Sequence, residues 1–124
     1  MESKKYKAAV IGLGRMGQLF ENDPLMKKPC SHAGAHTYLK DKVQLLAGCD
    51  LRQDRLKLFS EKYGVKRLYL DYKEMLKKEE IDILSVSTHA PQHKEIVVEA
   101  AKSGVKAILC EKPIASSLKE AEEM

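Results

Sequence analysis

The chain has 124 residues, 44% of them hydrophobic and 32% charged, which is ordinary for a globular protein and enough for one domain spanning 1–124. Its 22 basic and 18 acidic residues are spread along the chain, so the net charge of +4 predicts no nucleic-acid surface. No apolar run approaches the ~20 residues of a membrane span. The apolar start also lacks a leader cleavage site, and no cysteines have CxxC spacing. We therefore expect a cytoplasmic protein with no membrane partner.

Apolar runs alternate with helical patterns along the chain. Strands are predicted at 7–11, 43–49, 67–70, 81–86 and 105–110, and helices at 53–63, after 71, at 94–102 and from 117 to the end. Gly64 and Gly104 follow two of these helices, where a left-handed residue often ends a helix. Asp71 and Ser117 each begin a helix with the spacing of a capping box.

This alternation predicts βαβ units and a parallel sheet covered on both faces, a three-layer α/β/α fold. The strands read as nearly continuous apolar runs because both faces of such a sheet are buried. A doubly wound sheet of six strands needs one more strand after the last helix, so we expect a chain truncated before that strand. An unpaired sheet edge then predicts a homo-oligomer.

The first predicted strand is followed by a glycine-rich turn. The pattern is GxGxxG, formed by Gly12, Leu13, Gly14, Arg15, Met16 and Gly17. The three glycines serve the tight turn, close approach of the backbone to a pyrophosphate, and packing of the next helix on the strand. The N-terminus of that helix would offer N–H groups to phosphate. The setting favours a Rossmann-type dinucleotide site, with a plain tight turn or another nucleotide-like ligand as alternatives.

The second part of this pattern is an acid after the second strand, where it binds ribose hydroxyls. Asp50 has that position but lies further from the glycines than the usual spacing of ≈ 20 residues. We attribute the excess to an insertion at 20–35, since Pro24 and Pro29 exclude one uninterrupted helix there. Asp50 favours NAD by repelling a 2′-phosphate, whereas Arg52 keeps NADP open. The alternative role for Asp50 is in a helix cap or turn.

The insertion also contains Cys30, His32 and His36 at a spacing that metal ligands can have. A zinc site needs a fourth ligand or a defined water, and no fourth candidate stands nearby. We therefore predict no metal site, but a solvated loop with one histidine buried against the fold.

Ligands of doubly wound sheets bind outside the carboxyl ends of the strands. Two further polar segments follow strands here, residues 87–93 (STHAPQH) and the Glu111-Lys112-Pro113 turn. We predict that both face the same crevice as the glycine turn. The alternative for Glu111 and Lys112 is a structural ion pair beside a turn proline.

Together these residues resemble the Gfo/Idh/MocA-type (glucose–fructose oxidoreductase/inositol dehydrogenase) oxidoreductases over nearly the whole chain. The resemblance rests on the glycine turn, Asp50, Thr88 with His93 five residues later, and above all CEKPIA at 110–115. The glycine pattern is shared by many folds, whereas the Glu-Lys-Pro turn after the fifth strand is specific.

The resemblance implies roles for these positions. The segment from Gly12 to Gly17 would hold the pyrophosphate and Asp50 the adenosine ribose. The nicotinamide half would lie on a loop with Ser87, Thr88 and His93, and Glu111 would lie near its ribose. Lys112 would be the catalytic lysine, which hydrogen-bonds the reacting hydroxyl of a sugar or cyclitol substrate. Its bond to Pro113 would be cis, as in relatives.

Two departures from the family pattern affect these expectations. Relatives carry proline directly after the threonine, where this chain has His89, which we predict to be an additional ligand-facing group. The family's C-terminal α+β substrate domain, which completes the catalytic group, has no counterpart within 1–124. We therefore expect the NAD(P)-binding half of a dehydrogenase, inactive alone. The alternatives are a non-catalytic dinucleotide sensor or scaffold and, less favoured, a methyltransferase.

Overall fold

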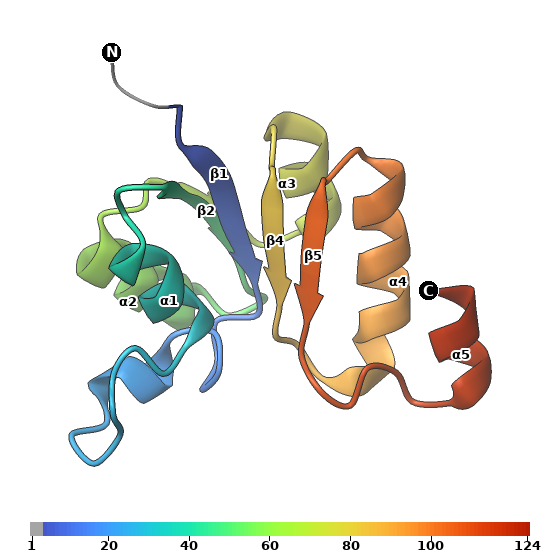
Figure 1. Ribbon diagram of the computed structural model, residues 1–124, viewed down its shortest axis with the longest axis horizontal. Coiled ribbons are helices and arrows are strands. Elements are labelled where there is room, and N and C mark those ends of the chain that lie inside the picture. The colour runs from blue at the N-terminus through green and yellow to red at the C-terminus, as the bar shows by residue number, and fades with distance from the viewer. Residues whose placement is uncertain (1–3) are drawn as a thin grey trace.

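The structure is a computed structural model that describes residues 4–124, and it contains one sheet of five parallel strands. The strands are β1 (Tyr6–Ile11), β2 (Val43–Cys49), β3 (Arg67–Tyr69), β4 (Ile83–Val86) and β5 (Ala107–Cys110). Their order is β3-β2-β1-β4-β5, so the chain reverses its direction of winding between β1 and β4. In Figure 1 the arrowheads of β1, β4 and β5 point to the same edge of the sheet. The predicted doubly wound, Rossmann-like fold is confirmed.

Helices cover both faces of the sheet (Figure 1). They are the 3₁₀ helix η1 (Leu19–Asn22) and the α-helices α1 (His32–Tyr38), α2 (Gln53–Tyr63), α3 (Tyr72–Lys78), α4 (Ala90–Lys102) and α5 (Leu118–Glu123). One apolar core joins α3 and α4 to the sheet through residues such as Met75, Leu84 and Ile96. The other joins α1 and α2 to the opposite face through Ala33 and Phe59.

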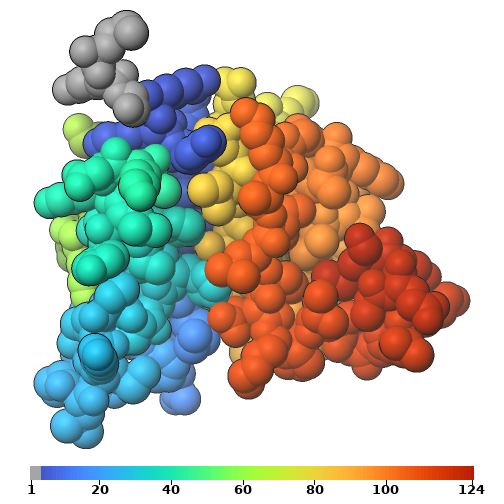
Figure 2. All heavy atoms as spheres, in the orientation of Figure 1, coloured from blue at the N-terminus to red at the C-terminus, as the bar shows by residue number. Residues whose placement is uncertain are grey.

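The edge strand β5 is less covered than the central strands. Leu109 within it and Ile114 just after it are 57% and 55% exposed. In Figure 2 the orange atoms of this part of the chain lie on the surface of the molecule, with no other segment in front of them. The predicted self-association through an unpaired edge stays a prediction. Within residues 4–124 no helix has the length and apolarity needed to cross a membrane.

The glycine turn does not open an α-helix, contrary to the prediction. The N–H groups of Leu19 and Phe20 each bond to a carbonyl five residues earlier, at Gly14 and Arg15, which makes one wide turn that continues into η1. The first α-helix begins only at His32, because Pro24 and Pro29 prevent a continuous helix in the segment before it. The predicted boundary of the insertion at residue 35 therefore falls inside α1.

The other differences concern where elements begin and how their ends are capped. Helix α4 starts at Ala90, four residues before the prediction, because Pro91 lies in its first turn, where a missing N–H costs nothing. Strands β4 and β5 are each two residues shorter at their start than predicted. Asp71 caps α3 by accepting from Lys73 N, and Ser117 caps α5 by accepting from Glu120 N. Within the described residues neither helix has the reciprocal bond of a full capping box.

Candidate dinucleotide-binding site

A cavity of about 950 Å³ lies along the carboxyl ends of the strands. Its lining comes from the glycine turn, the ends of β2 and β4, the first turn of α4 and the segment after β5, and it includes Gly12, Gly14, Arg15, Met16, Asp50, Arg52, Arg55, Ser87, Thr88, His89, Glu111 and Lys112. The structure thus brings most of the predicted site residues into one cavity. Leu13, Gly17 and His93 are not among its lining residues.

The glycine turn is shaped by backbone contacts that exclude side chains at two positions. Gly12 has a φ of +93°, and a Cβ there would lie 2.7 Å from the carbonyl carbon of Ser87. A Cβ on Gly17 would lie 2.0 Å from the carbonyl oxygen of Gly12. Gly14 differs, because its Cβ would meet only the guanidinium of Arg55, at 3.5 Å. Packing thus requires glycine at 12 and 17, whereas Gly14 faces the cavity.

The turn leaves backbone donors available. Leu13 N donates to Asp50 and Gly12 N to Cys49 O. Among the contacts of residues 4–124, however, the N–H groups of Gly14, Arg15 and Met16 have no acceptor. All three residues line the cavity. Successive free N–H groups in a turn form a concave site that binds anions, so these donors fit a pyrophosphate.

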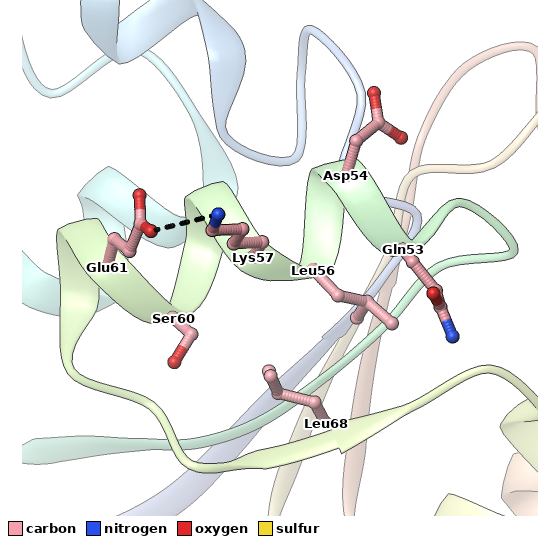
Figure 3. A pocket seen from close by; sticks show the side chains of 7 residues that line it. All are labelled: Gln53, Asp54, Leu56, Lys57, Ser60, Glu61 and Leu68. Carbon is pink, nitrogen blue, oxygen red and sulfur yellow. Dashed lines mark ion pairs between the residues drawn. The ribbon is translucent and has the colours of Figure 1, made fainter.

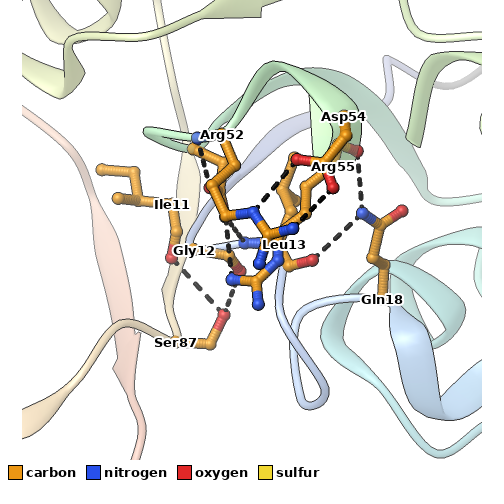
Figure 4. Close-up of polar contacts among 9 residues, drawn as sticks. Ile11, Gly12, Leu13, Gln18, Arg52, Asp54, Arg55 and Ser87 are labelled. Carbon is orange, nitrogen blue, oxygen red and sulfur yellow. Dashed lines mark hydrogen bonds and ion pairs between the residues drawn. The ribbon is translucent and has the colours of Figure 1, made fainter. Parts of the chain in front are cut away.

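Asp50 follows β2 and bonds to the turn beside it. Its Oδ2 accepts from Leu13 N at 2.8 Å, and its Oδ1 accepts from Arg52 N at 2.8 Å, just before α2 (contacts of Leu13 and Arg52 in Figure 4). The side chain is 7% exposed. Asp50 therefore does stabilise a turn, which was the alternative role considered for it. A carboxylate has about four acceptor positions, so it can still accept from a ribose hydroxyl.

Two arginines lie near Asp50 and differ in what they contact (Figure 4). Arg52 forms a forked pair with Asp54, with Nη2–Oδ2 at 2.7 Å, and this pairing lowers the pKa of the Asp54 carboxyl. Arg55 instead lies over Gly14, with Nη1 3.9 Å from Asp50 Oδ2. The prediction named Arg52 and missed Arg55. Its place in the first turn of α2 was the available signal, because helix side chains lean toward the N-terminus.

The end of β4 is held against the glycine turn. Ser87 Oγ donates to Gly12 O at 2.6 Å. Thr88 Oγ1 is buried and has no hydrogen-bond partner among residues 4–124, although Thr88 lines the cavity. A buried hydroxyl without a partner is costly, so this group fits a ligand that supplies one. His89 is exposed and is the N-cap residue of α4.

His93 has no exposed surface and lies inside the fold, whereas it was predicted on the cofactor side. Its Nε2 is 2.8 Å from Thr88 O, and its Nδ1 is 3.0 Å from Pro113 O. The ring therefore joins the segment after β4 to the segment after β5. We interpret His93 as a residue that holds these two loops together.

The Glu111-Lys112-Pro113 turn completes the cavity. Glu111 N donates to Val86 O at 2.8 Å, which extends the pairing of β4 and β5 by one residue. The Lys112–Pro113 peptide bond is cis, as the resemblance implied. Lys112 is exposed and lines the cavity, and its Nζ forms no hydrogen bond or ion pair with any of residues 4–124. Glu111 and Lys112 are thus not a structural ion pair with each other.

The segment considered as a metal site has other contacts. His32 Nε2 lies 2.9 Å from Glu111 Oε1, and His36 Nε2 lies 2.9 Å from Ser85 Oγ. Burial lowers the pKa of His36, to which the nearby His32 adds a smaller effect. Both rings are buried, so the prediction of a single buried histidine is wrong. No group of three ligating side chains forms within residues 4–124.

A second, open hollow of about 630 Å³ lies on the surface between α2 and β3 (Figure 3). Its base is formed by Leu56 and Leu68, and its rim carries the Lys57–Glu61 pair at 4.0 Å. None of the predicted site residues line it, so it is not the candidate site.

Comparison with known proteins identifies the family of this chain. Residues 6–124 match the family described as "Oxidoreductase family, NAD-binding Rossmann fold". The chain is 36% identical to a D-apiose dehydrogenase of Paraburkholderia graminis over 98% of its own length and 28% of the relative's. It is 32% identical to a myo-inositol 2-dehydrogenase of Thermotoga maritima over 95% of its own length and 31% of the relative's.

A solved structure gives the same result. The WlbA dehydrogenase from Chromobacterium violaceum, in complex with NADH and UDP-GlcNAcA, superposes with a TM-score of 0.82 at 25% identity and covers 99% of this chain and 32% of that one. The chain therefore spans about a third of the length of the proteins it matches. By sequence and by fold, it belongs to this oxidoreductase family with an NAD-binding Rossmann domain.

Proposed function

We propose that this chain binds NAD along the carboxyl ends of its strands, with the adenosine half at β2 and the nicotinamide half between β4 and β5. The observation that carries this proposal is the free N–H groups of Gly14, Arg15 and Met16, which face one cavity together with Asp50 and Lys112. These donors suit a pyrophosphate in the middle of the cavity, with one nucleoside on each side.

NAD is the preferred cofactor in this proposal. A 2′-phosphate at the adenosine ribose would lie beside the Asp50 carboxylate, which already accepts two backbone N–H groups and is held in place. Arg52 is paired with Asp54, which reduces its capacity to offset that repulsion. Among residues 4–124, Arg55 is the arginine that lies near both Asp50 and Gly14, so it would set how well the site binds NADP.

The chemistry proposed for the whole protein is oxidation of a secondary alcohol. A bound nicotinamide ring would supply its C4 atom as the acceptor of the hydride from the carbinol carbon in oxidation, and as the donor in reduction. Lys112 Nζ, free of protein partners among the described residues, would hydrogen-bond the substrate oxygen. In its neutral form the amine accepts the hydroxyl proton during oxidation, and in its charged form it returns that proton during reduction. Glu111 would contact the nicotinamide ribose.

The substrate class we propose is a sugar or cyclitol, because the relatives are named as dehydrogenases of apiose and myo-inositol. Residues 1–124 would form the cofactor domain, with the rest of the substrate pocket contributed by parts of the protein outside this segment. We favour this catalytic role over a sensor or scaffold, since Lys112 faces the cavity without a structural partner in residues 4–124.

The test is calorimetric titration of the chain with NAD, NADP and their reduced forms. We expect NAD to bind more tightly than NADP. Asp50→Asn should weaken NAD roughly 10- to 150-fold, because a hydrogen bond to a charged group contributes roughly 1.5–3 kcal/mol, and it should reduce the difference between NAD and NADP affinity. Asp41→Asn is the matched control, since this carboxylate is exposed and does not line the cavity. Absence of NAD binding by the wild type, or unchanged binding by folded Asp50→Asn, would contradict the proposal.

A further inference from the structure

One contact joins the first α-helix to the turn that carries Lys112. His32, the first residue of α1, lies 79 positions before Glu111 in the sequence, yet its Nε2 is 2.9 Å from Glu111 Oε1. The histidine side chain is 8% exposed and the glutamate side chain 22%. A hydrogen bond to a carboxylate in such a partly buried place is stronger than one between neutral groups.

His32 is itself held in place by backbone bonds to the glycine turn. His32 N donates to Met16 O at 2.8 Å, and Ala33 N donates to Gly17 O at 2.9 Å. The preceding residue, Ser31, caps α1 and also bonds to the buried carboxylate of Glu21. The backbone of His32 is therefore fixed beside the glycine turn, which also presents N–H donors to the cavity.

Among the described residues, Glu111 has no other side-chain anchor of this kind. Its Oε2 accepts only the long 3.3 Å contact from Lys112 N among residues 4–124, and its side chain has three rotatable bonds. The residue lines the cavity next to Lys112, whereas His32 does not line it. Fixing Oε1 therefore selects which way the second oxygen of the carboxylate faces.

We propose that His32 is a positioning residue, which holds the Glu111 carboxylate toward the nicotinamide ribose. This inference rests on the proposed function, because it assigns the ligand of Glu111 to the nicotinamide half of the dinucleotide. His32 acts through Glu111 and does not touch the ligand. The segment that separates the glycine turn from α1 thus has a role in the site, since it delivers this histidine to the Glu-Lys-Pro turn.

The test compares NAD with ADP, which lacks the nicotinamide riboside and so does not reach Glu111. His32→Leu removes the donor and should weaken NAD about tenfold, the effect of one hydrogen bond to a charged group. ADP affinity should stay within about twofold, the error of such a comparison. His32→Gln places an amide N–H at a similar reach and should restore most of the NAD affinity. In a Glu111→Ala background, His32→Leu should have no further effect.

His36→Leu is the matched control. It removes the bond of a second buried histidine of α1 to Ser85, away from the cavity, so it should lower thermal stability without changing the ratio of NAD to ADP affinity. If His32→Leu does not fold, His32→Asn removes the same contact, because its shorter amide does not reach Glu111, and it should show the same loss for NAD alone.

An unchanged NAD-to-ADP ratio in folded His32→Leu, or in Glu111→Ala, would overturn the inference and leave the proposed function intact. Equal losses for both ligands would also overturn it, because they would show a purely structural role. Failure of the wild type to bind NAD would instead reject the proposed function, and the assignment of Glu111 with it.

Discussion

The glycine turn makes a sharp prediction, because two of its glycines face different surroundings. In Gly14→Ala the new methyl group meets only the end of the Arg55 side chain, at 3.5 Å, which is an ordinary contact with a flexible group. We expect its free energy of unfolding to change by less than about 0.5 kcal/mol, as for a surface substitution. Gly14 nevertheless lines the cavity, so the methyl group should take up space where the pyrophosphate is proposed to bind.

Gly17→Ala should behave in the opposite way. Its Cβ would lie 2.0 Å from the carbonyl oxygen of Gly12 and 2.9 Å from the Cα of Leu13, so the backbone itself must shift. Overpacking of this kind costs about 1–3 kcal/mol, and more where rigid backbone is involved. We expect a clearly lowered midpoint in urea for Gly17→Ala, and loss of NAD binding because the turn is distorted.

The assays are urea denaturation and calorimetric titration with NAD on both variants. For Gly14→Ala, displacing the pyrophosphate by one methyl group should cost about 1–3 kcal/mol of binding, or roughly 5- to 150-fold in affinity. The reasoning would be refuted if Gly14→Ala bound NAD like the wild type, or if Gly17→Ala kept wild-type stability.

Two further predictions concern stability. Because burial lowers the pKa of His36 from its ordinary value of 6.5, the unfolded chain binds more protons just below that pH, and stability should fall as pH drops. One such histidine changes the free energy of unfolding by at most about 1.4 kcal/mol per pH unit. Thermal unfolding measured at several pH values should show a weaker pH dependence for His36→Leu than for the wild type, and equal pH dependence would contradict this. Gly48→Ala places a Cβ 2.5 Å from the buried Phe59 ring and should cost about 1–3 kcal/mol in urea unfolding; an unchanged midpoint would contradict the packing.

Much of the fold followed from local patterns. Most strands are short apolar runs. The rule that ligands bind at the carboxyl ends of parallel strands was then enough to bring Asp50, Thr88 and Lys112 to one edge. Gly64 ends α2 with a φ of +69°, as its position after the helical pattern predicted. These features depend on backbone preferences and periodicity, which a single sequence displays.

The parts that escaped prediction depend on tertiary contacts. No local pattern indicates that His32 reaches Glu111, or that His93 turns inward to bond Thr88 O and Pro113 O. The sequence predicted a helix directly after the glycine turn, but the chain forms a wide turn and a 3₁₀ helix there. Turn, 3₁₀ and α-helical hydrogen bonds compete in this segment, and two prolines follow before α1. Such segments have weak periodicity, and the start of α1 is fixed by the Ser31 cap, which accepts from Gly34 N, together with the packing of Ala33 on the sheet.

The central claim is that neighbouring strand ends form one site for an extended dinucleotide, and a crystal structure of this chain with NADH tests it most directly. The account predicts the pyrophosphate within hydrogen-bond distance of the N–H groups of Gly14, Arg15 and Met16. It also predicts the adenosine ribose at Asp50 and the nicotinamide beside Lys112. NADH bound outside this cavity, or reversed with its nicotinamide at Asp50, would contradict the account.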